Sequence, residues 1–150
     1  MTRKVRTYNF KKSDNFKSKI IEYSKDFNCF CFLDSNSNLE DGSFDYLFAF
    51  KKDKELLNPP FPFDSLKEFI DIHQDWIFGY LTYDLKNDIE KLTSKNGDYQ
   101  FFPKLHFFVP EIIFKIKDCI LSVLYNSKHS ISEIDNLFNK INAITINETL

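Results

Sequence analysis

The sequence has little glycine. Of its 150 residues only three are glycine, and Gly42, Gly79 and Gly97 lie far apart. Dinucleotide-binding fingerprints and P-loops need several glycines within a few residues, because the backbone there must approach phosphate groups closely. Three isolated glycines cannot form either motif, so the sequence excludes these two kinds of nucleotide site.

Cysteine and histidine are equally scarce, with three of each. Cys29 and Cys31 share one face of an expected strand, Cys119 stands alone, and no C-x-x-C occurs. This pattern favours buried free thiols over disulfides or a zinc site. None of the histidines neighbours a Ser or Cys in a recognisable nucleophile arrangement. The residues alone therefore predict neither a catalytic group nor a metal ligand.

The chain also lacks a dominant charge and a long apolar run. Its 20 basic and 22 acidic residues give a net charge of −2, without the strongly cationic face that nucleic-acid binding needs. No run approaches the ~20 apolar residues of a membrane span, and the basic residues 2–6 are not followed by a signal-peptide core. We expect a cytoplasmic protein with no nucleic-acid or membrane partner.

What the chain does contain is phenylalanine and regular apolar patterning, with a hydrophobic fraction of 43%. Alternation and short apolar runs predict strands over 5–10, 29–33, 44–50, 76–83, 105–109, 111–117 and 120–125. The runs 29–33 and 76–83 are typical of strands buried on both faces. We expect 51–62 to break the chain's regular structure, and Pro110 to separate two strands.

Helices are predicted over 14–26 with Ser13 as N-cap, and after two capping boxes, Ser65–Glu68 and Ser130–Glu133. Residues 84–92 are charged and are expected to form a helical turn or two. Strands follow strands more often than helices separate them. The sequence therefore predicts an α+β fold with a mainly antiparallel, sandwich-like sheet and about three helices.

Three segments resemble one family of chorismate-utilising enzymes. Residues 76–90 (WIFGYLTYDLKNDIE) are similar to the Gly-Tyr-x-x-Tyr-Asp strand and turn of the N-terminal region of anthranilate synthase and aminodeoxychorismate synthase component I. Residues 102–110 (FPKLHFFVP) resemble the family's Phe-Pro-x-Leu-x-Phe-Phe-x-Pro segment, and 32–35 (FLDS) its Leu-Leu-Glu-Ser stretch. Asp34 stands where anthranilate synthases usually carry Glu. Residues 83–88 (YDLKND) are most similar to the aminodeoxychorismate synthase branch.

The resemblance implies that residues 1–150 form the N-terminal, non-catalytic domain of aminodeoxychorismate synthase component I. With a glutamine amidotransferase subunit, that enzyme aminates chorismate for 4-aminobenzoate and folate synthesis. Similar enzymes hold chorismate and Mg²⁺ in a C-terminal domain that lies outside this sequence. The chain alone is therefore expected to be inactive and to hold no cofactor.

The resemblance also implies roles for particular residues. Asp34 and Ser35 end an expected strand beside a polar loop, where they would line an amino-acid pocket with tryptophan as the candidate ligand. The other motif residues are expected to serve the scaffold. Gly79 would let another backbone approach closely, Tyr80 and Tyr83 would face opposite sides of one strand, and Asp84 would cap the next turn.

Other functions remain open at this point. The chain is alternatively the corresponding domain of anthranilate synthase component I, a free-standing amino-acid-binding or regulatory module, or a docking domain for a glutamine amidotransferase.

Three short helices, each with an apolar stripe of about 100°, cannot cover all the apolar strands. We therefore expect an exposed patch that the C-terminal domain would cover. Its candidate members are Phe48, Phe50, Trp76, Phe78, Tyr80 and Phe107.

Overall fold

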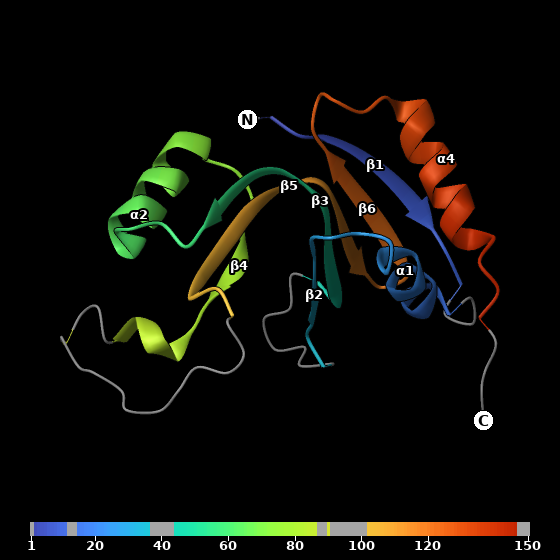
Figure 1. The fold of residues 1–150 in the computed structure, drawn as a ribbon. Helices are drawn as coiled ribbons and strands as arrows, with labels where there is room; N and C mark the ends of the chain where they lie inside the picture. Colours follow the sequence, from blue (N-terminus) through green and yellow to red (C-terminus); the bar gives the residue numbers. More distant parts are fainter. Residues whose placement is uncertain (1, 12–14, 37–43, 87–89, 91–101, 147–150) are drawn as a thin grey trace. The chain divides into compact units, whose positions relative to one another are not determined.

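The computed structural model describes residues 2–11, 15–36, 44–86, 90 and 102–146. Their helices and strands are labelled in Figure 1. In chain order the elements are β1 (Lys4–Asn9), α1 (Phe16–Ser24), β2 (Phe30–Asp34), β3 (Tyr46–Leu57), α2 (Pro62–His73), β4 (Phe78–Leu81), the 3-10 turn η2 (Tyr83–Leu85), β5 (Leu105–Lys117), β6 (Ile120–Tyr125) and α4 (Ile131–Asn142).

The strands in the described part of the chain form one sheet with the order β1-β6-β5-β3-β2, and β4 also pairs with β5. The pairings β1–β6, β2–β3, β4–β5 and β5–β6 are all antiparallel. The predicted α+β class with a mainly antiparallel sheet is thus confirmed. The strands join a single sheet, however, rather than two facing sheets.

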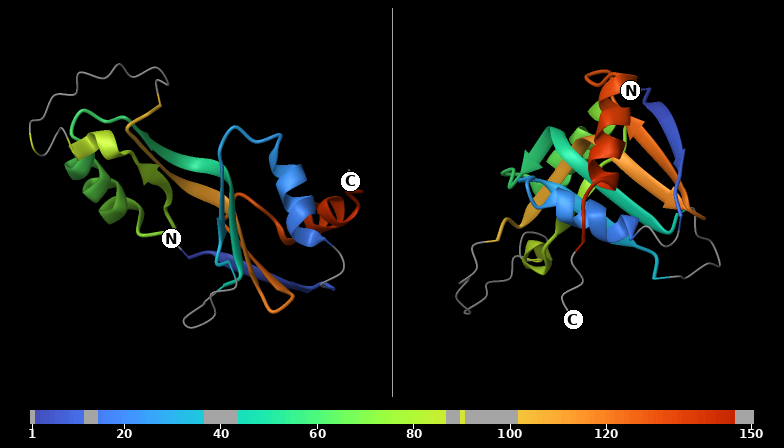
Figure 2. Two further views of the ribbon diagram at one scale, coloured as in Figure 1. Left: turned by 90° about the horizontal axis from the view of Figure 1, so that it is seen from below. Right: turned by 90° about the vertical axis from the view of Figure 1, so that its right-hand side faces the viewer.

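The main hydrophobic core lies between helices α1 and α4 and one face of the sheet. Figure 2 shows the two helices on the same side of the sheet. Phe16 and Ile20 of α1 and Ile134 and Ile141 of α4 are all buried there. The sheet contributes alternate residues of three strands, namely Phe48, Phe50, Ile112, Phe114, Ile116, Leu121, Val123 and Tyr125. Alternation works here because successive strand residues point to opposite faces.

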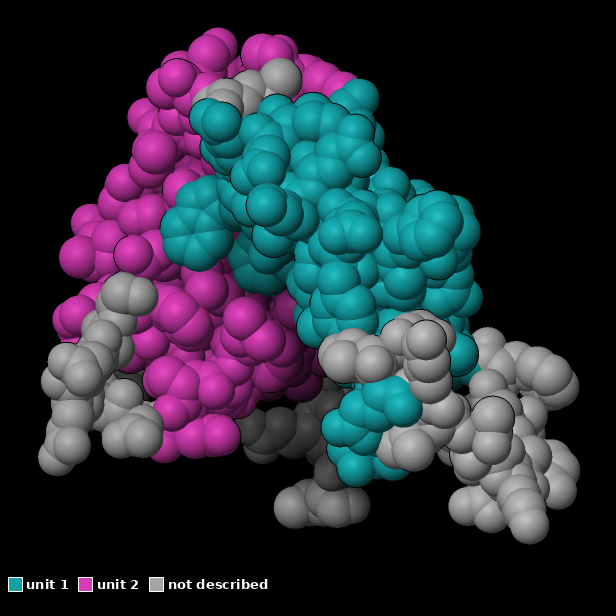
Figure 3. Space-filling model, turned by 90° about the vertical axis from the view of Figure 1, so that its left-hand side faces the viewer, with its two compact units in different colours: residues 1, 52–110 teal, residues 2–51, 111–150 magenta. Residues whose placement is uncertain are grey.

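The chain divides into two compact units, coloured separately in Figure 3. Unit 1 comprises residues 1 and 52–110, and unit 2 comprises residues 2–51 and 111–150. The core just described belongs entirely to unit 2. Unit 1 contains α2, β4, η2 and parts of β3 and β5. Its buried hydrophobic side chains are Phe69, Phe78, Leu85, Leu105, Phe108 and Val109.

In unit 2 a tight turn joins the segments predicted as strands over 111–117 and 120–125, and the predicted capping box at Ser130 is confirmed. Asp118 and Cys119 join β5 to β6 with φ angles of 50° and 63°, as a two-residue hairpin turn with two left-handed residues requires. Ser130 caps α4, since its hydroxyl accepts a hydrogen bond from the Glu133 N–H at 3.3 Å. The Glu133 carboxylate in turn accepts from the Ser130 N–H at 2.6 Å, which completes the capping box.

Two predicted strand breaks are wrong. β3 continues through 51–57, where we expected the break to begin. Within this strand Lys51 has a left-handed backbone conformation, with φ 55°. β5 continues through Pro110 as one strand of 13 residues. Its pairing with β4 ends at Phe108 and its pairing with β6 begins at Ile112. Pro110 falls between these two paired stretches and so lies outside both the β4 and the β6 ladder.

Two strands expected to be buried on both faces are not. β2 stands at the end of the strand order, and its Phe30 and Leu33 are 37% and 44% exposed. β4 has only four residues, and the flanking Trp76 is exposed. An apolar run gives no information on whether a strand will lie at a sheet edge, and this is why both predictions failed.

Two predicted helix starts also differ from the structure. α2 begins at Pro62, three residues before the expected capping box, because proline fits the first turn of a helix. Ser65 is already inside the helix, where its N–H donates to the Phe61 carbonyl. α1 begins after Asn15, whose φ is 49°. The expected cap Ser13 lies outside the described residues.

Candidate functional site

The two predicted pocket residues, Asp34 and Ser35, lie together at the end of β2 in unit 2. Asp34 pairs with Tyr46 across the β2–β3 ladder, and Phe32 lies two residues earlier on the same face of β2. The N–H of Ser35 donates to the Asp45 carbonyl at 3.0 Å, which holds the strand end against the start of β3. Local strand pairing therefore fixes one carboxylate beside two aromatic rings.

A residue that the sequence did not single out completes this arrangement. The Lys17 ammonium, from the first turn of α1, donates to Asp34 Oδ2 at 2.5 Å. The same nitrogen lies 4.7 Å from the ring centroid of Tyr46 and 5.3 Å from that of Phe32. Both distances are within the range in which the negative face of a ring attracts a cation.

Both oxygens of the Asp34 carboxylate accept hydrogen bonds from groups of its own chain. Besides Lys17, the N–H of Asn36 donates to Asp34 Oδ1 at 2.8 Å. The hydrogen bond from Lys17, and to a lesser extent that from Asn36, lowers the pKa of Asp34 below its ordinary value. The carboxylate is thus ionised near neutral pH and already has a cationic partner. No spacing rule links residue 17 to residue 34, so sequence reasoning missed this contact.

Gly79 lies in β4 directly opposite Phe107 of β5. A Cβ atom at this position would be 2.1 Å from the His106 carbonyl oxygen and 2.6 Å from the Phe107 Cα. Real Cβ atoms essentially never come that near to backbone. The close backbone approach expected at Gly79 is confirmed, and the residue has a packing role.

Tyr80, Tyr83 and Asp84 do not form a common site. Tyr80 packs edge-on against His106, with ring centroids 5.9 Å apart, and burial raises the pKa of its hydroxyl. β4 ends at Leu81, so Tyr83 lies in η2 and the two tyrosines do not share a strand. The Tyr83 side chain is 79% exposed. Asp84 lies within η2 rather than before it, and the N-cap is Thr82.

A polar cluster in unit 1 joins β3 to β5. His106 Nε2 lies 3.0 Å from Glu55 Oε1, and the Lys52 ammonium donates to Glu55 Oε2 at 2.5 Å. The bond from Lys52 is the main cause that lowers the pKa of Glu55. No group of three or more His, Cys, Asp or Glu side chains that could hold a metal ion occurs among the described residues.

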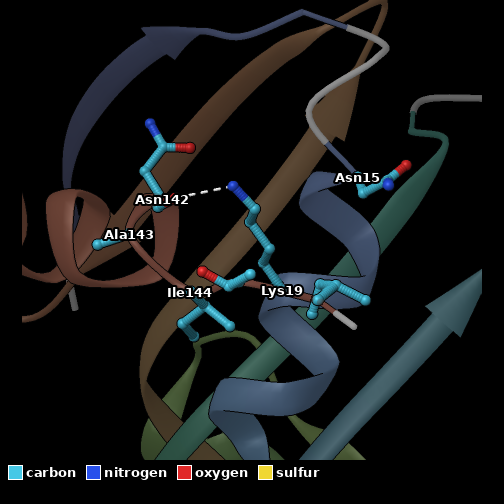
Figure 4. Close-up of a pocket in the computed structure, with 7 residues that line it drawn as sticks. Asn15, Lys19, Asn142, Ala143 and Ile144 are labelled. Carbon is cyan, nitrogen blue, oxygen red and sulfur yellow. Dashed lines mark hydrogen bonds between the residues drawn. The ribbon is translucent and has the colours of Figure 1, made fainter. Parts of the chain in front are cut away.

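A cavity of about 440 Å³ lies elsewhere in unit 2, between the start of α1 and the chain after α4 (Figure 4). Asn15, Lys19 and residues 142–146 line it. The Lys19 ammonium donates across it to the Asn142 carbonyl at 2.7 Å, the bond drawn in Figure 4. Neither Asp34 nor Ser35 lines this cavity, so it is distinct from the predicted pocket.

Comparison with known proteins does not assign a family. No protein-family model matches the sequence, and no curated protein matches it. Within the described ranges, no helix is long and apolar enough to cross a membrane.

Proposed function

We propose that this chain is the N-terminal, non-catalytic domain of aminodeoxychorismate synthase component I. The observation that carries the proposal is that two of the three family-like segments are direct neighbours. β4, from the segment 76–90, pairs with β5, from the segment 102–110, in the register Gly79↔Phe107. The glycine of one motif is required by the backbone of the other. Two separate resemblances thus describe one packed unit.

In this role the domain supplies scaffold rather than chemistry. Chorismate and Mg²⁺ would be held by a C-terminal chorismate-binding domain, and ammonia would come from a glutamine amidotransferase subunit. The described residues do not fit a Mg²⁺ site, since they place no three metal-binding side chains together. We therefore assign no step of the reaction to this domain.

Unit 1 exposes many large apolar side chains, and this supports the proposal that the domain works with a partner. Its large apolar side chains with substantial exposure include Leu57, Phe61, Phe63, Ile70, Ile72, Trp76, Leu81, Tyr83 and Phe102. Large apolar patches are unusual on monomeric proteins and commonly mark interaction surfaces. We assign this surface to the chorismate-binding domain of the same enzyme.

Inactivation of the gene in its host tests the proposal. We expect growth to require 4-aminobenzoate, because folate synthesis would lack its precursor. A requirement relieved by tryptophan instead would identify the domain as part of anthranilate synthase. No requirement of either kind, together with a stop codon directly after codon 150, would overturn the proposal and favour a free-standing module.

A biochemical test is independent of the host. The purified 150-residue chain should form no aminodeoxychorismate or anthranilate from chorismate, ammonia and Mg²⁺. Steady product formation by the chain alone would contradict a non-catalytic role.

A further inference from the structure

We propose that Phe32, Asp34 and Tyr46 form a binding site for a primary alkylammonium group, and that the chain's own Lys17 closes this site to ligands. We call these three residues the ammonium site. The inference rests on contacts within unit 2 and holds whether or not the chain belongs to a synthase.

The chemistry of the ammonium site matches its occupant. An alkylammonium carries three N–H donors and a full positive charge. Asp34 offers a carboxylate at 2.5 Å, and the rings of Tyr46 and Phe32 offer their negative faces at 4.7 Å and 5.3 Å. A carboxylate with two aromatic faces is the combination that recognises organic cations.

The walls of the ammonium site are held by contacts that do not involve Lys17. Asn36 fixes the Asp34 carboxylate through its backbone N–H. Phe32 stacks on Phe48, with centroids 4.5 Å apart and planes 16° from parallel, and Phe48 is fully buried. Tyr46 is held opposite Asp34 by the β2–β3 ladder. We therefore expect the site to persist when the Lys17 side chain is shortened.

Lys17 has the advantage of being tethered. A group on the same chain acts at an effective concentration of the order of millimolar or more, whereas a free amine must compete at its own concentration. Free amines, amino acids among them, therefore compete poorly for Asp34 in the native chain unless they are in large excess. Regulation by an amino acid through this carboxylate would require Lys17 to leave.

A titration with n-propylammonium chloride, followed by ¹H–¹⁵N NMR, tests the inference. In Lys17→Met we expect saturable shifts confined to residues 32–36 and 46, with affinity at least about tenfold higher than in the native chain. Asp34→Asn added to that variant should abolish them. Lys25→Met is the matched control, because Lys25 also lies 2.5 Å from a carboxylate, that of Glu22, but in an exposed i,i+3 pair. It should behave as the native chain.

Two results would overturn the inference. One is equal affinity of the native chain and Lys17→Met for propylammonium, and the other is the absence of saturable shifts in a folded Lys17→Met.

If Lys17→Met does not fold, the native chain still provides a test through the Lys17 ¹⁵Nζ signal. That signal should be protected from exchange, and excess propylammonium should shift it while equal NaCl does not. A Lys17 signal that exchanges as fast as that of Lys25 would also overturn the inference. None of these readouts depends on chorismate, so they fail or succeed separately from the proposed function.

Discussion

The two units treat their large apolar side chains differently. In unit 2 two helices lie on one sheet face, and the aromatic residues of that face, such as Phe48, Phe50 and Phe114, are fully or almost fully buried. In unit 1 the helix α2 buries only Phe69, while Phe63, Ile70 and Ile72 of the same helix stay exposed. Unit 2 therefore covers the aromatic side chains on one face of its sheet, whereas unit 1 leaves most large apolar side chains of α2 exposed.

The comparison refines the expected apolar patch. Of its predicted members, Phe48, Phe50 and Phe78 are buried, Tyr80 and Phe107 are partly covered, and Trp76 is exposed. The expectation was a patch that contains some of these residues, and the buried Phe48, Phe50 and Phe78 do not belong to it. Helices α1 and α4 cover the sheet face of Phe48 and Phe50. The exposed apolar surface concentrates in unit 1, and some of its members come from α2 itself.

The largest expected effect comes from emptying the unit 2 core. Phe114→Ala should lower the free energy of unfolding by about 3–5 kcal/mol, since the phenyl ring is fully buried and packs edge-on against Phe50. Urea unfolding followed by circular dichroism measures this loss. A loss below about 1 kcal/mol would mean that this core is not the stable part of the chain.

A smaller effect, confined to unit 1, is expected from Gly79→Ala. The added methyl group would overlap the backbone at His106 and Phe107, which should cost about 1–3 kcal/mol. Native-state hydrogen exchange should show faster exchange in 78–81 and 105–108. The amides of β6 and α4 should keep their protection, and equal acceleration there would show that the two units unfold together.

The two capping-box sequences allow a matched pair of substitutions. Ser130→Ala should destabilise by about 1 kcal/mol, because Ser130 caps α4. Ser65→Ala should be neutral or slightly stabilising, because Ser65 lies inside α2 and alanine favours helix. Thermal unfolding of both variants checks the difference. Equal losses would contradict the observed start of α2.

The pH dependence of unit 2 should follow Asp135. Hydrogen bonds from the Tyr8 hydroxyl and from Arg6 lower the pKa of Asp135 below its ordinary value of 3.8, the former more strongly. A carboxyl with a lowered pKa stabilises the fold above its unfolded pKa, and this contribution disappears as the pH falls through the folded pKa.

Asp135→Asn should therefore reduce the melting temperature at pH 7 and make little difference below the folded pKa of Asp135. Melting curves of both proteins between pH 7 and pH 2 measure this. A difference that stays constant with pH would mean that the charge of Asp135 does not contribute.

The smallest effect on stability is expected at the exposed surface of unit 1. Phe61 is 70% exposed, so Phe61→Ser should change the unfolding free energy by less than about 0.5 kcal/mol. It should nevertheless reduce binding of a hydrophobic dye. Val5→Ser is the control, because Val5 is 58% exposed in unit 2, outside this apolar surface. An unchanged dye signal in Phe61→Ser would remove Phe61 from the interaction surface.

Part of the candidate site could be predicted from neighbouring residues in the sequence, and part depends on contacts between distant residues. Asp34 and Ser35 were singled out because residues 32–35 resemble the family's Leu-Leu-Glu-Ser stretch and end an expected strand beside a polar loop. The amino-acid pocket that they would line stays a prediction. Lys17 was not found, since it lies 17 residues before Asp34, and only the packing of α1 against β2 brings the two together. The ion pair between Lys17 and Asp34 therefore cannot be predicted from the residues next to Asp34 in the sequence.

The sequence by itself determined the features that depend on neighbouring residues. The α+β class, the strands over 111–117 and 120–125 and the capping box of Ser130 all follow from side chains within a few positions of one another. The tertiary structure alone decided the length of β5 through Pro110, the edge position of β2 and the partner of Asp34. Each of these depends on which distant strand or helix lies alongside, and short-range patterns do not contain that information.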